Sequence, residues 1–309
     1  MNLIASMNSK HLSVFIALLL MVGLTSCFNN DLTDPNAGQA ALNDQQIKDY
    51  LTANQLQDKV TLSPSGLYYL ISGVSASGKA ATPANELEFT YTLSYIDPTT
   101  KKAVLVDSAN ATKSAYIPFL SGVVVQGLEE GFLLLKEGQT GRFFMPSSIG
   151  FGNDTRKDKM PAYSAVIFDV KLIRSRTEEQ QIDDYVTIKN LSAPIDTANS
   201  IRVYRITPGT GSTIAAGNTV TVAYTANSLR GTTPFDKSDS LTFVAGSGQY
   251  IEGFSMGVTK LKVGDKALLV FPSLRGYGVQ GSYDQSKGYY VVPPYTPLAF
   301  EITVKSVKK

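Results

Sequence analysis

Tyr250-Ile251-Glu252-Gly253-Phe254 and Gly276-Tyr277-Gly278 are the two short motifs that decide how the second half of this chain folds. Four further motifs keep a fixed order around them: Tyr224, Phe235-Asp236, Val291-Val292-Pro293-Pro294 and Phe300-Glu301. Each motif alone is weak, because a tyrosine between glycines is typical of any turn and aromatic residues on alternating strands are more often core residues. Their joint order makes the pattern specific.

The first half of the chain carries the same frame with substitutions. Its motifs are Tyr91, Val106-Asp107, Val124-Val125-Gln126-Gly127-Leu128, Gly150-Phe151-Gly152, Met160-Pro161 and Phe168-Asp169. A helical motif also returns, first at residues 45–51 and again at 180–186. A period of about 135 residues is too long for a solenoid repeat and fits two whole domains. The sequence therefore predicts a tandem duplication.

Alternating apolar and polar residues predict strands in both halves, with short helical patterns between them. The strand patterns lie at residues 66–71, 87–93, 165–172, 201–206, 219–224 and 298–304, and the internal helices at 128–136 and 254–261. Thr177 and Gln180 have the spacing of a capping box at the start of the helix that opens the second half. The predicted fold class is α+β: two tandem domains, each an antiparallel β-sheet wrapped on one short helix and preceded by an amphipathic helix.

Composition narrows the chemistry that this chain can perform. Of its 309 residues 43% are hydrophobic and 17% are charged, and the formal net charge is +2. A nearly neutral chain lacks the basic footprint of a nucleic-acid-binding protein. His11 is the only histidine and Cys27 the only cysteine, so the chain beyond them has no Ser-His-Asp or Cys-His mechanism, zinc site of His and Cys, or disulfide. We expect an activity that uses no cofactor, no metal and no strong acid, base or nucleophile.

Residues 1–26 have the pattern of an export signal, with one lysine before an apolar run that is too short to span a bilayer. The run ends in Leu24-Thr25-Ser26-Cys27, which resembles the bacterial lipobox, in which the cysteine is lipidated. An ordinary secretory signal with an incidental cysteine is the alternative. We expect a protein of the bacterial cell envelope that is anchored to a membrane through Cys27. Residues 27–42 would be a flexible tether, with a first domain at 43–176 and a second at 177–309.

The order of motifs in residues 217–307 resembles the pocket of the FKBP-type peptidyl-prolyl cis-trans isomerases. The resemblance implies catalysed rotation about X–Pro bonds in proline-containing polypeptides. That rotation faces a barrier of about 18–20 kcal/mol, which comes from the partial double bond of the amide. It needs only a pocket that binds the twisted amide better than the planar one. A chain without histidine or cysteine in its domains can perform this reaction.

The resemblance assigns a role to eight residues of the second half. Phe254 occupies the floor position, where the family usually has tryptophan, and four residues match wall positions: Tyr224, Phe235, Val292 and Phe300. The backbone N–H of Ile251 and the hydroxyl of Tyr277 match groups that donate hydrogen bonds to substrate carbonyls. Asp236 matches a carboxylate beside the Tyr224 hydroxyl.

The first half matches the family less closely, over residues 82–173. It keeps Tyr91, Asp107, Val125 and Phe168, but it places Val106 on a wall, Leu128 on the floor and Phe151 where the tyrosine hydroxyl is expected. We therefore expect activity mainly in the second domain. The loop at 153–159 is highly charged and is interpreted as a solvated turn, whereas the tyrosines at 289 and 290 of the corresponding second loop are expected to meet a ligand.

Three functions fit this pattern. The first is a prolyl isomerase that assists the folding of exported proteins in the bacterial cell envelope. The second is a non-catalytic peptide-binding chaperone. The substitutions in the first pocket, and Phe254 in place of tryptophan in the second, favour this function. The third is a structural envelope lipoprotein that reuses the scaffold, in which neither pocket would bind a peptide.

Overall fold

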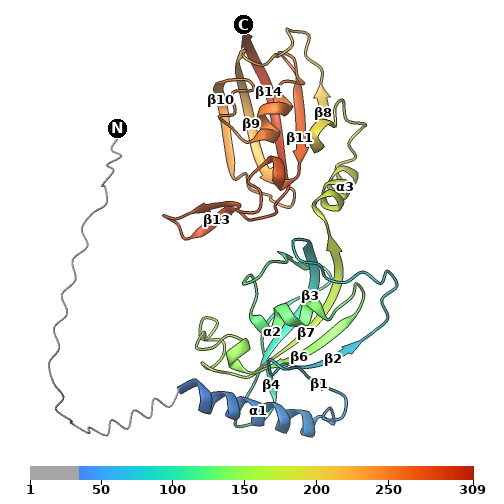
Figure 1. Ribbon diagram of the computed structural model, residues 1–309, viewed down its shortest axis with the longest axis vertical. Helices are drawn as coiled ribbons and strands as arrows, with labels where there is room; N and C mark the ends of the chain where they lie inside the picture. Colours follow the sequence, from blue (N-terminus) through green and yellow to red (C-terminus); the bar gives the residue numbers. More distant parts are fainter. Residues whose placement is uncertain (1–34) are drawn as a thin grey trace, which may run out of the picture. The chain divides into compact units, whose positions relative to one another are not determined.

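The computed structural model describes residues 35–309 (Figure 1). The expected signal at 1–26, Cys27 and the first part of the expected tether lie outside the described residues. Helix α1, Pro35–Ala53, begins within that tether, so residues 35–42 are helical rather than flexible. Proline suits the first turn of a helix, because the N–H that it lacks would have no partner there, and the alanines that follow favour helix. No helix among residues 35–309 is long and apolar enough to cross a membrane.

Within the described residues the first domain contains a seven-stranded antiparallel sheet. Its strands are β1 (Thr61–Leu62), β2 (Tyr68–Ser72), β3 (Glu86–Ile96), β4 (Ala103–Ala109), β5 (Ala115–Pro118), β6 (Thr140–Met145) and β7 (Val166–Arg176). Their order is β1-β2-β6-β7-β3-β4, and β5 pairs with the opposite end of β3 from β4. The short 3-10 helix η1, Ser147–Ile149, follows β6.

The second domain contains a five-stranded antiparallel sheet and a separate hairpin. The sheet strands are β8 (Arg202–Thr207), β9 (Thr219–Ser228), β10 (Asp236–Val244), β11 (Lys266–Phe271) and β14 (Leu298–Lys308), and the 3-10 helices are η2 (Ala198–Ser200) and η3 (Ser273–Arg275). The order β10-β9-β14-β11-β8 repeats the order β4-β3-β7-β6-β2 of the first domain. Strands β12 (Ser282–Asp284) and β13 (Tyr289–Val292) form the hairpin, which extends away from this sheet (Figure 1). The predicted α+β class and duplication are confirmed.

One short helix packs on the inner face of each sheet. These are α2, Gln126–Leu133, and α4, Glu252–Val258, which begin and end slightly earlier than the sequence predicts. Leu128 of α2 and Phe254 of α4 point into the two cores. A Cβ on Gly253 would lie 2.4 Å from the Phe271 ring, so glycine is required for α4 to approach β11 this closely. That approach places Phe254 in the core of the second domain.

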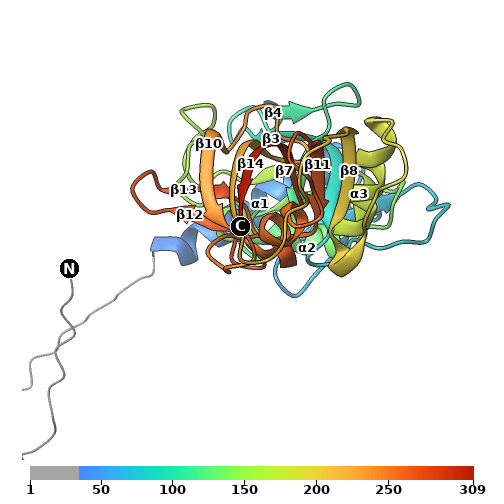
Figure 2. The same ribbon diagram turned by 90° about the horizontal axis from the view of Figure 1, so that it is seen from above.

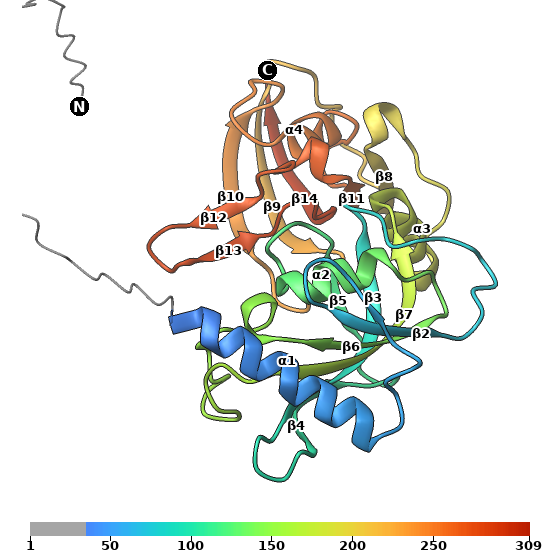
Figure 3. The same ribbon diagram turned by 60° about the horizontal axis from the view of Figure 1, so that its bottom comes forward.

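A longer helix covers the outer face of each sheet. Helix α1 lies beside the sheet of the first domain (Figure 3), and its Ile47 and Leu51 pack against Phe144. In the second, α3, Glu178–Ile188, lies beside β8 (Figure 2), and its Ile182 packs against Tyr204. The predicted capping box is present at the start of α3: the Gln180 N–H donates to Thr177 Oγ1 at 3.2 Å, and the Thr177 N–H donates to Gln180 Oε1 at 3.0 Å. Both faces of each sheet are therefore covered, in part by helix.

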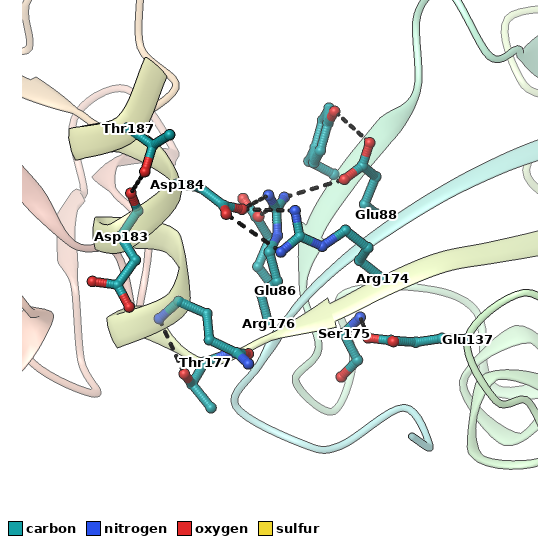
Figure 4. A network of polar contacts seen from close by, with 12 residues as sticks. Glu86, Glu88, Glu137, Arg174, Ser175, Arg176, Thr177, Asp183, Asp184 and Thr187 are labelled. Carbon is teal, nitrogen blue, oxygen red and sulfur yellow. Dashed lines mark hydrogen bonds and ion pairs between the residues drawn. The ribbon is translucent and has the colours of Figure 1, made fainter. Parts of the chain in front are cut away.

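Arg176 ends β7 and connects it to α3 through a network of ion pairs (Figure 4). Its side chain is 5% exposed and lies 2.5 Å from Glu86, 3.4 Å from Glu88 and 2.8 Å from Asp184 of α3. Its Nε is the one buried side-chain nitrogen or oxygen without a hydrogen-bond partner in the described part of the chain. Removing one member of such a buried network leaves uncompensated charge. The network therefore holds α3, through Asp184, against the end of β7.

Candidate functional site

Phe254, the predicted floor residue of the second domain, is 2% exposed. We call the predicted site around Phe254 the second pocket. The Phe254 ring centroid lies 5.5 Å from that of Tyr224 and 5.6 Å from that of Phe300, two of the predicted wall residues. Phe243 and Tyr250 also contact it, with centroids at 5.1 and 5.7 Å. Sequence reasoning gave these two residues no role. Phe243 follows the inward alternation of β10, which is the pattern that indicates its position.

The remaining predicted wall residues lie together on the same side of the sheet. The Phe235 ring is 6.1 Å from Phe300 and 6.2 Å from Tyr277, edge to face in both cases. Val292 is buried in the same cluster as Phe254 and Phe300. Edge-to-face aromatic pairs at these separations are favourable beyond the area that they bury. The structure therefore brings the predicted floor and walls into one aromatic cluster.

Tyr224 and Asp236 form the polar pair of this pocket. The Tyr224 hydroxyl donates to Asp236 Oδ2 at 2.6 Å. Burial, followed by the hydrogen bond and the charge of Asp236, raises the pKa of Tyr224 above its usual value. The phenol thus stays neutral over the physiological range, and the carboxylate has a fixed donor. This pair orients the Tyr224 ring against the floor.

Two hydrogen-bond donors of the second pocket have no partner within the described residues. Ile251 is the N-cap of α4, and in the described part of the chain no group accepts a hydrogen bond from its backbone N–H. The Tyr277 hydroxyl likewise has no partner among residues 35–309, although the Tyr277 residue is partly buried. Burial, and then the charge of Asp236, raises the pKa of Tyr277, so its hydroxyl keeps its proton. Neither donor therefore uses its hydrogen-bonding capacity within residues 35–309.

The first domain contains an open cavity of about 480 Å³ at the equivalent position. The Tyr91 hydroxyl donates to Asp107 Oδ2 at 2.7 Å, and burial followed by this carboxylate raises the pKa of Tyr91 to about 12. Leu128 is buried on the floor, and the Phe151 ring lies 6.1 Å from Phe168. Like Ile251, the N-cap residue Val125 has a backbone N–H with no acceptor in the described part of the chain.

The loops beside the two pockets differ from the sequence interpretation in one respect. Arg156, which was interpreted as part of a solvated turn, lines the first cavity, and its guanidinium carbon lies 5.0 Å from the Phe151 ring centroid. A cation attracted to the face of an aromatic ring explains this placement. On the second loop, Tyr289 and Tyr290 are exposed on hairpin β12–β13, and Tyr290 packs edge to face on Tyr283 at 5.0 Å.

The second pocket therefore combines a buried aromatic cluster with two donors that have no acceptor among the described residues. Its carboxylate already accepts a hydrogen bond from Tyr224. The arrangement suits a reaction that depends on shape and polarity, in which no proton is transferred.

A family model described as FKBP-type peptidyl-prolyl cis-trans isomerase matches residues 78–173 and 211–305, one segment in each domain. Among curated proteins, the chain is 26% identical over 232 residues to peptidyl-prolyl cis-trans isomerase FKBP10 of Bos taurus, covering 74% of this chain and 35% of that protein. It is 29% identical over 141 residues to the probable FKBP-type isomerase FkpA of Neisseria meningitidis, covering 46% and 49%. The chain thus spans between about a third and a half of the length of these relatives.

Two solved structures are similar to parts of the chain. A peptidyl-prolyl cis-trans isomerase from Pseudomonas syringae is 28% identical with a TM-score of 0.36, covering 43% of this chain and 91% of that one. The three FKBP domains of wheat FKBP73 are 18% identical with a TM-score of 0.36, covering 80% and 96%. The two segments that match the family model make up more than half of the chain. The chain belongs to the FKBP-type peptidyl-prolyl cis-trans isomerase family, and it carries two copies of the family domain in tandem.

Proposed function

We propose that this protein catalyses cis-trans isomerisation of X–Pro bonds, mainly in its second domain. The observation that carries the proposal is the pair of free donors, the Ile251 N–H and the Tyr277 hydroxyl, beside a buried aromatic floor. A prolyl ring on Phe254 would leave the carbonyls that flank it within reach of these donors. The family membership of the chain supports the reaction class.

The pocket lowers the barrier by binding one state of the amide better than another. Twisting the X–Pro bond breaks its resonance, so the carbonyl oxygen becomes less polar and more easily accommodated in a dry aromatic site. The planar ground state loses more hydration on entering the same site. Donors that hold the flanking carbonyls fix the chain on both sides of the rotating bond. The difference in binding between twisted and planar amide is the catalytic effect.

The proposed substrates are proline-containing polypeptides that fold after export to the bacterial cell envelope. The export-signal pattern at residues 1–26 and the lipobox-like Leu24-Thr25-Ser26-Cys27 support this location and a lipid anchor at Cys27. Expression of the full chain in bacteria fed radiolabelled palmitate tests the anchor. Label should follow the wild-type protein and be lost from Cys27→Ala. Equal labelling of both chains would refute lipidation at this residue.

A protease-free prolyl isomerisation assay on the chain from residue 28 onward tests the activity. The proposal expects acceleration that the double variant Tyr277→Phe, Asp236→Ala loses. The matched control changes the other pocket, Tyr91→Phe with Asp107→Ala, and should retain most of the rate. If the wild-type chain is folded and gives no acceleration, the isomerase proposal fails.

A peptide-binding chaperone is the second candidate, and the exposed tyrosines of hairpin β12–β13 favour it. Tyr283, Tyr289 and Tyr290 are 52%, 54% and 46% exposed, respectively. Aromatic side chains on a projecting hairpin suit the capture of extended apolar segments. Suppressed aggregation of an unfolded client, in the absence of any isomerisation, would favour this function over catalysis.

A further inference from the structure

The first pocket lacks the donor that the second pocket has in Tyr277, because Phe151 takes the equivalent place in the sequence. Its cavity nevertheless remains open and keeps the free N–H of Val125. A peptide in this cavity would therefore find one carbonyl partner and miss the other. An unpaired buried carbonyl opposes binding, so another donor is needed if this pocket is to bind a prolyl peptide.

Arg156 is placed to supply that donor. Its guanidinium lies over the Phe151 ring, 5.0 Å from the centroid, and the same side chain lines the cavity. Asp154 is the one carboxylate within ion-pair distance in the described part of the chain, at 3.5 Å, and both side chains are about half exposed. A guanidinium has five N–H groups in a planar fork. A single long ion pair leaves donors of Arg156 facing the cavity.

The backbone of the loop holds Arg156 over the ring. Arg156, Lys157 and Asp158 have φ values of 51°, 60° and 62°, so three consecutive residues adopt the left-handed conformation. The Arg156 N–H donates to Asp154 Oδ1 at 2.7 Å, and the Asp158 N–H donates to Thr155 Oγ1 at 3.2 Å. Such a run is unfavourable for residues with side chains, and these turn contacts help to offset its cost. The loop therefore curls back toward the pocket.

We propose that Arg156 donates the hydrogen bond to the substrate carbonyl in the first pocket that the Tyr277 hydroxyl donates in the second, which makes the first pocket a second prolyl-peptide site. This inference rests on the proposed function of the second pocket. A hydrogen bond from a charged donor strengthens binding by roughly tenfold to a hundredfold. Because Arg156 holds a carbonyl of both the planar and the twisted peptide, its removal raises KM more than it lowers kcat.

Nitrogen-15 NMR of the chain from residue 28 onward tests the proposal with a blocked Ala-Leu-Pro-Phe peptide as the probe. The Nε–Hε resonance of Arg156, identified by its loss in Arg156→Lys, should shift as the peptide is added. The amide resonance of Val125 should shift with the same apparent Kd. In Arg156→Met that Kd should rise at least tenfold. Adding Phe151→Tyr to this variant should restore much of the affinity, because it reinstates a hydroxyl donor.

An unchanged Val125 titration in Arg156→Met would overturn the role of Arg156, and so would a peptide that shifts Val125 but leaves the Arg156 side chain unmoved. The amide of Ile251 reports on the second pocket in the same spectra. If Ile251 responds and Val125 does not, the inference fails while the proposed function survives. If neither responds, both fail.

Discussion

In the second pocket the Tyr224 hydroxyl donates to Asp236 at 2.6 Å, and in the first the Tyr91 hydroxyl donates to Asp107 at 2.7 Å. The same helix N-cap leaves a free N–H in each, and each keeps a phenylalanine, Phe300 or Phe168, beside the tyrosine ring. The pockets diverge at the floor, at the second donor and in the loop. The tyrosine–aspartate pair, the free N-cap N–H and the phenylalanine therefore belong to the scaffold of both domains. They do not by themselves identify an active pocket.

The shared tyrosine–aspartate pair lies between neighbouring strands of each sheet, β9 and β10 in the second domain and β3 and β4 in the first. Cross-strand pairs of this kind stabilise a sheet edge whether or not a ligand binds. By contrast, the Tyr277 hydroxyl has no partner among residues 35–309 and offers a contact that only a ligand uses. We expect the pair to affect stability in both domains and the divergent groups to separate their activities.

The largest expected effect comes from emptying the floor. Phe254→Ala should destabilise the second domain by about 3–5 kcal/mol, because it leaves a cavity among the Tyr224, Phe243 and Phe300 rings. Leu128→Ala is the matched change in the first domain and should cost about 2–5 kcal/mol, toward the lower end. Urea unfolding followed by domain-specific NMR resonances measures both. A smaller loss at Phe254 than at Leu128 would show that the aromatic floor is not the better packed of the two.

The second donor gives the next effect. Tyr277→Phe removes one neutral hydrogen bond and leaves the ring in place, so kcat/KM should fall by roughly three- to tenfold, or about 0.5–1.5 kcal/mol. The reciprocal change Phe151→Tyr, made in a chain that already carries Tyr277→Phe, should raise the remaining rate. Isomerisation kinetics on both variants test this pair of expectations. A rate that is insensitive to Tyr277→Phe would place the carbonyl contact elsewhere.

The sequence predicted the duplication, the α+β class, the capping box at Thr177 and the residues that meet around Phe254. The first three follow from alternation along strands, the repeated order of motifs and side-chain spacing at a helix start, whereas the residues around Phe254 follow from the resemblance to the FKBP-type isomerases. It did not predict that Arg156 lies over the Phe151 ring, because a charged loop is interpreted as solvated unless its backbone turns back toward the domain. It also missed the helix at 35–42, because the polar residues there show no periodic apolar pattern. The contact of Phe243 with Phe254 was missed as well, although the alternation along β10 indicates its inward position.

Alkaline pH should weaken the polar pairs of both pockets. The pKa of Tyr91 is about 12 in the folded protein and about 10 in an unfolded chain. Its contribution to stability is complete below pH 10 and is lost as pH rises to about 12, because the unfolded chain releases the proton first. The free energy of unfolding of wild type should approach that of Tyr91→Phe over this pH range. Urea unfolding at successive pH values measures this difference. The difference in free energy of unfolding between wild type and Tyr224→Phe should narrow in the same way. A difference that stays constant with pH, for either tyrosine, would contradict the raised pKa of that tyrosine.

The smallest effect on stability is expected where the loops differ most. Tyr289 and Tyr290 are exposed, so the change of both to serine should alter the free energy of unfolding by no more than about 0.5 kcal/mol. If the hairpin contacts bound peptide, the same variant should raise KM for long prolyl substrates and leave short ones unaffected, because only a long chain reaches the projecting tyrosines. The first domain supplies the control: Lys157→Ser with Lys159→Ser changes the corresponding charged loop and should leave both KM values as they are. If the hairpin variant and the wild type have equal KM values for long substrates, the hairpin does not contact the bound peptide.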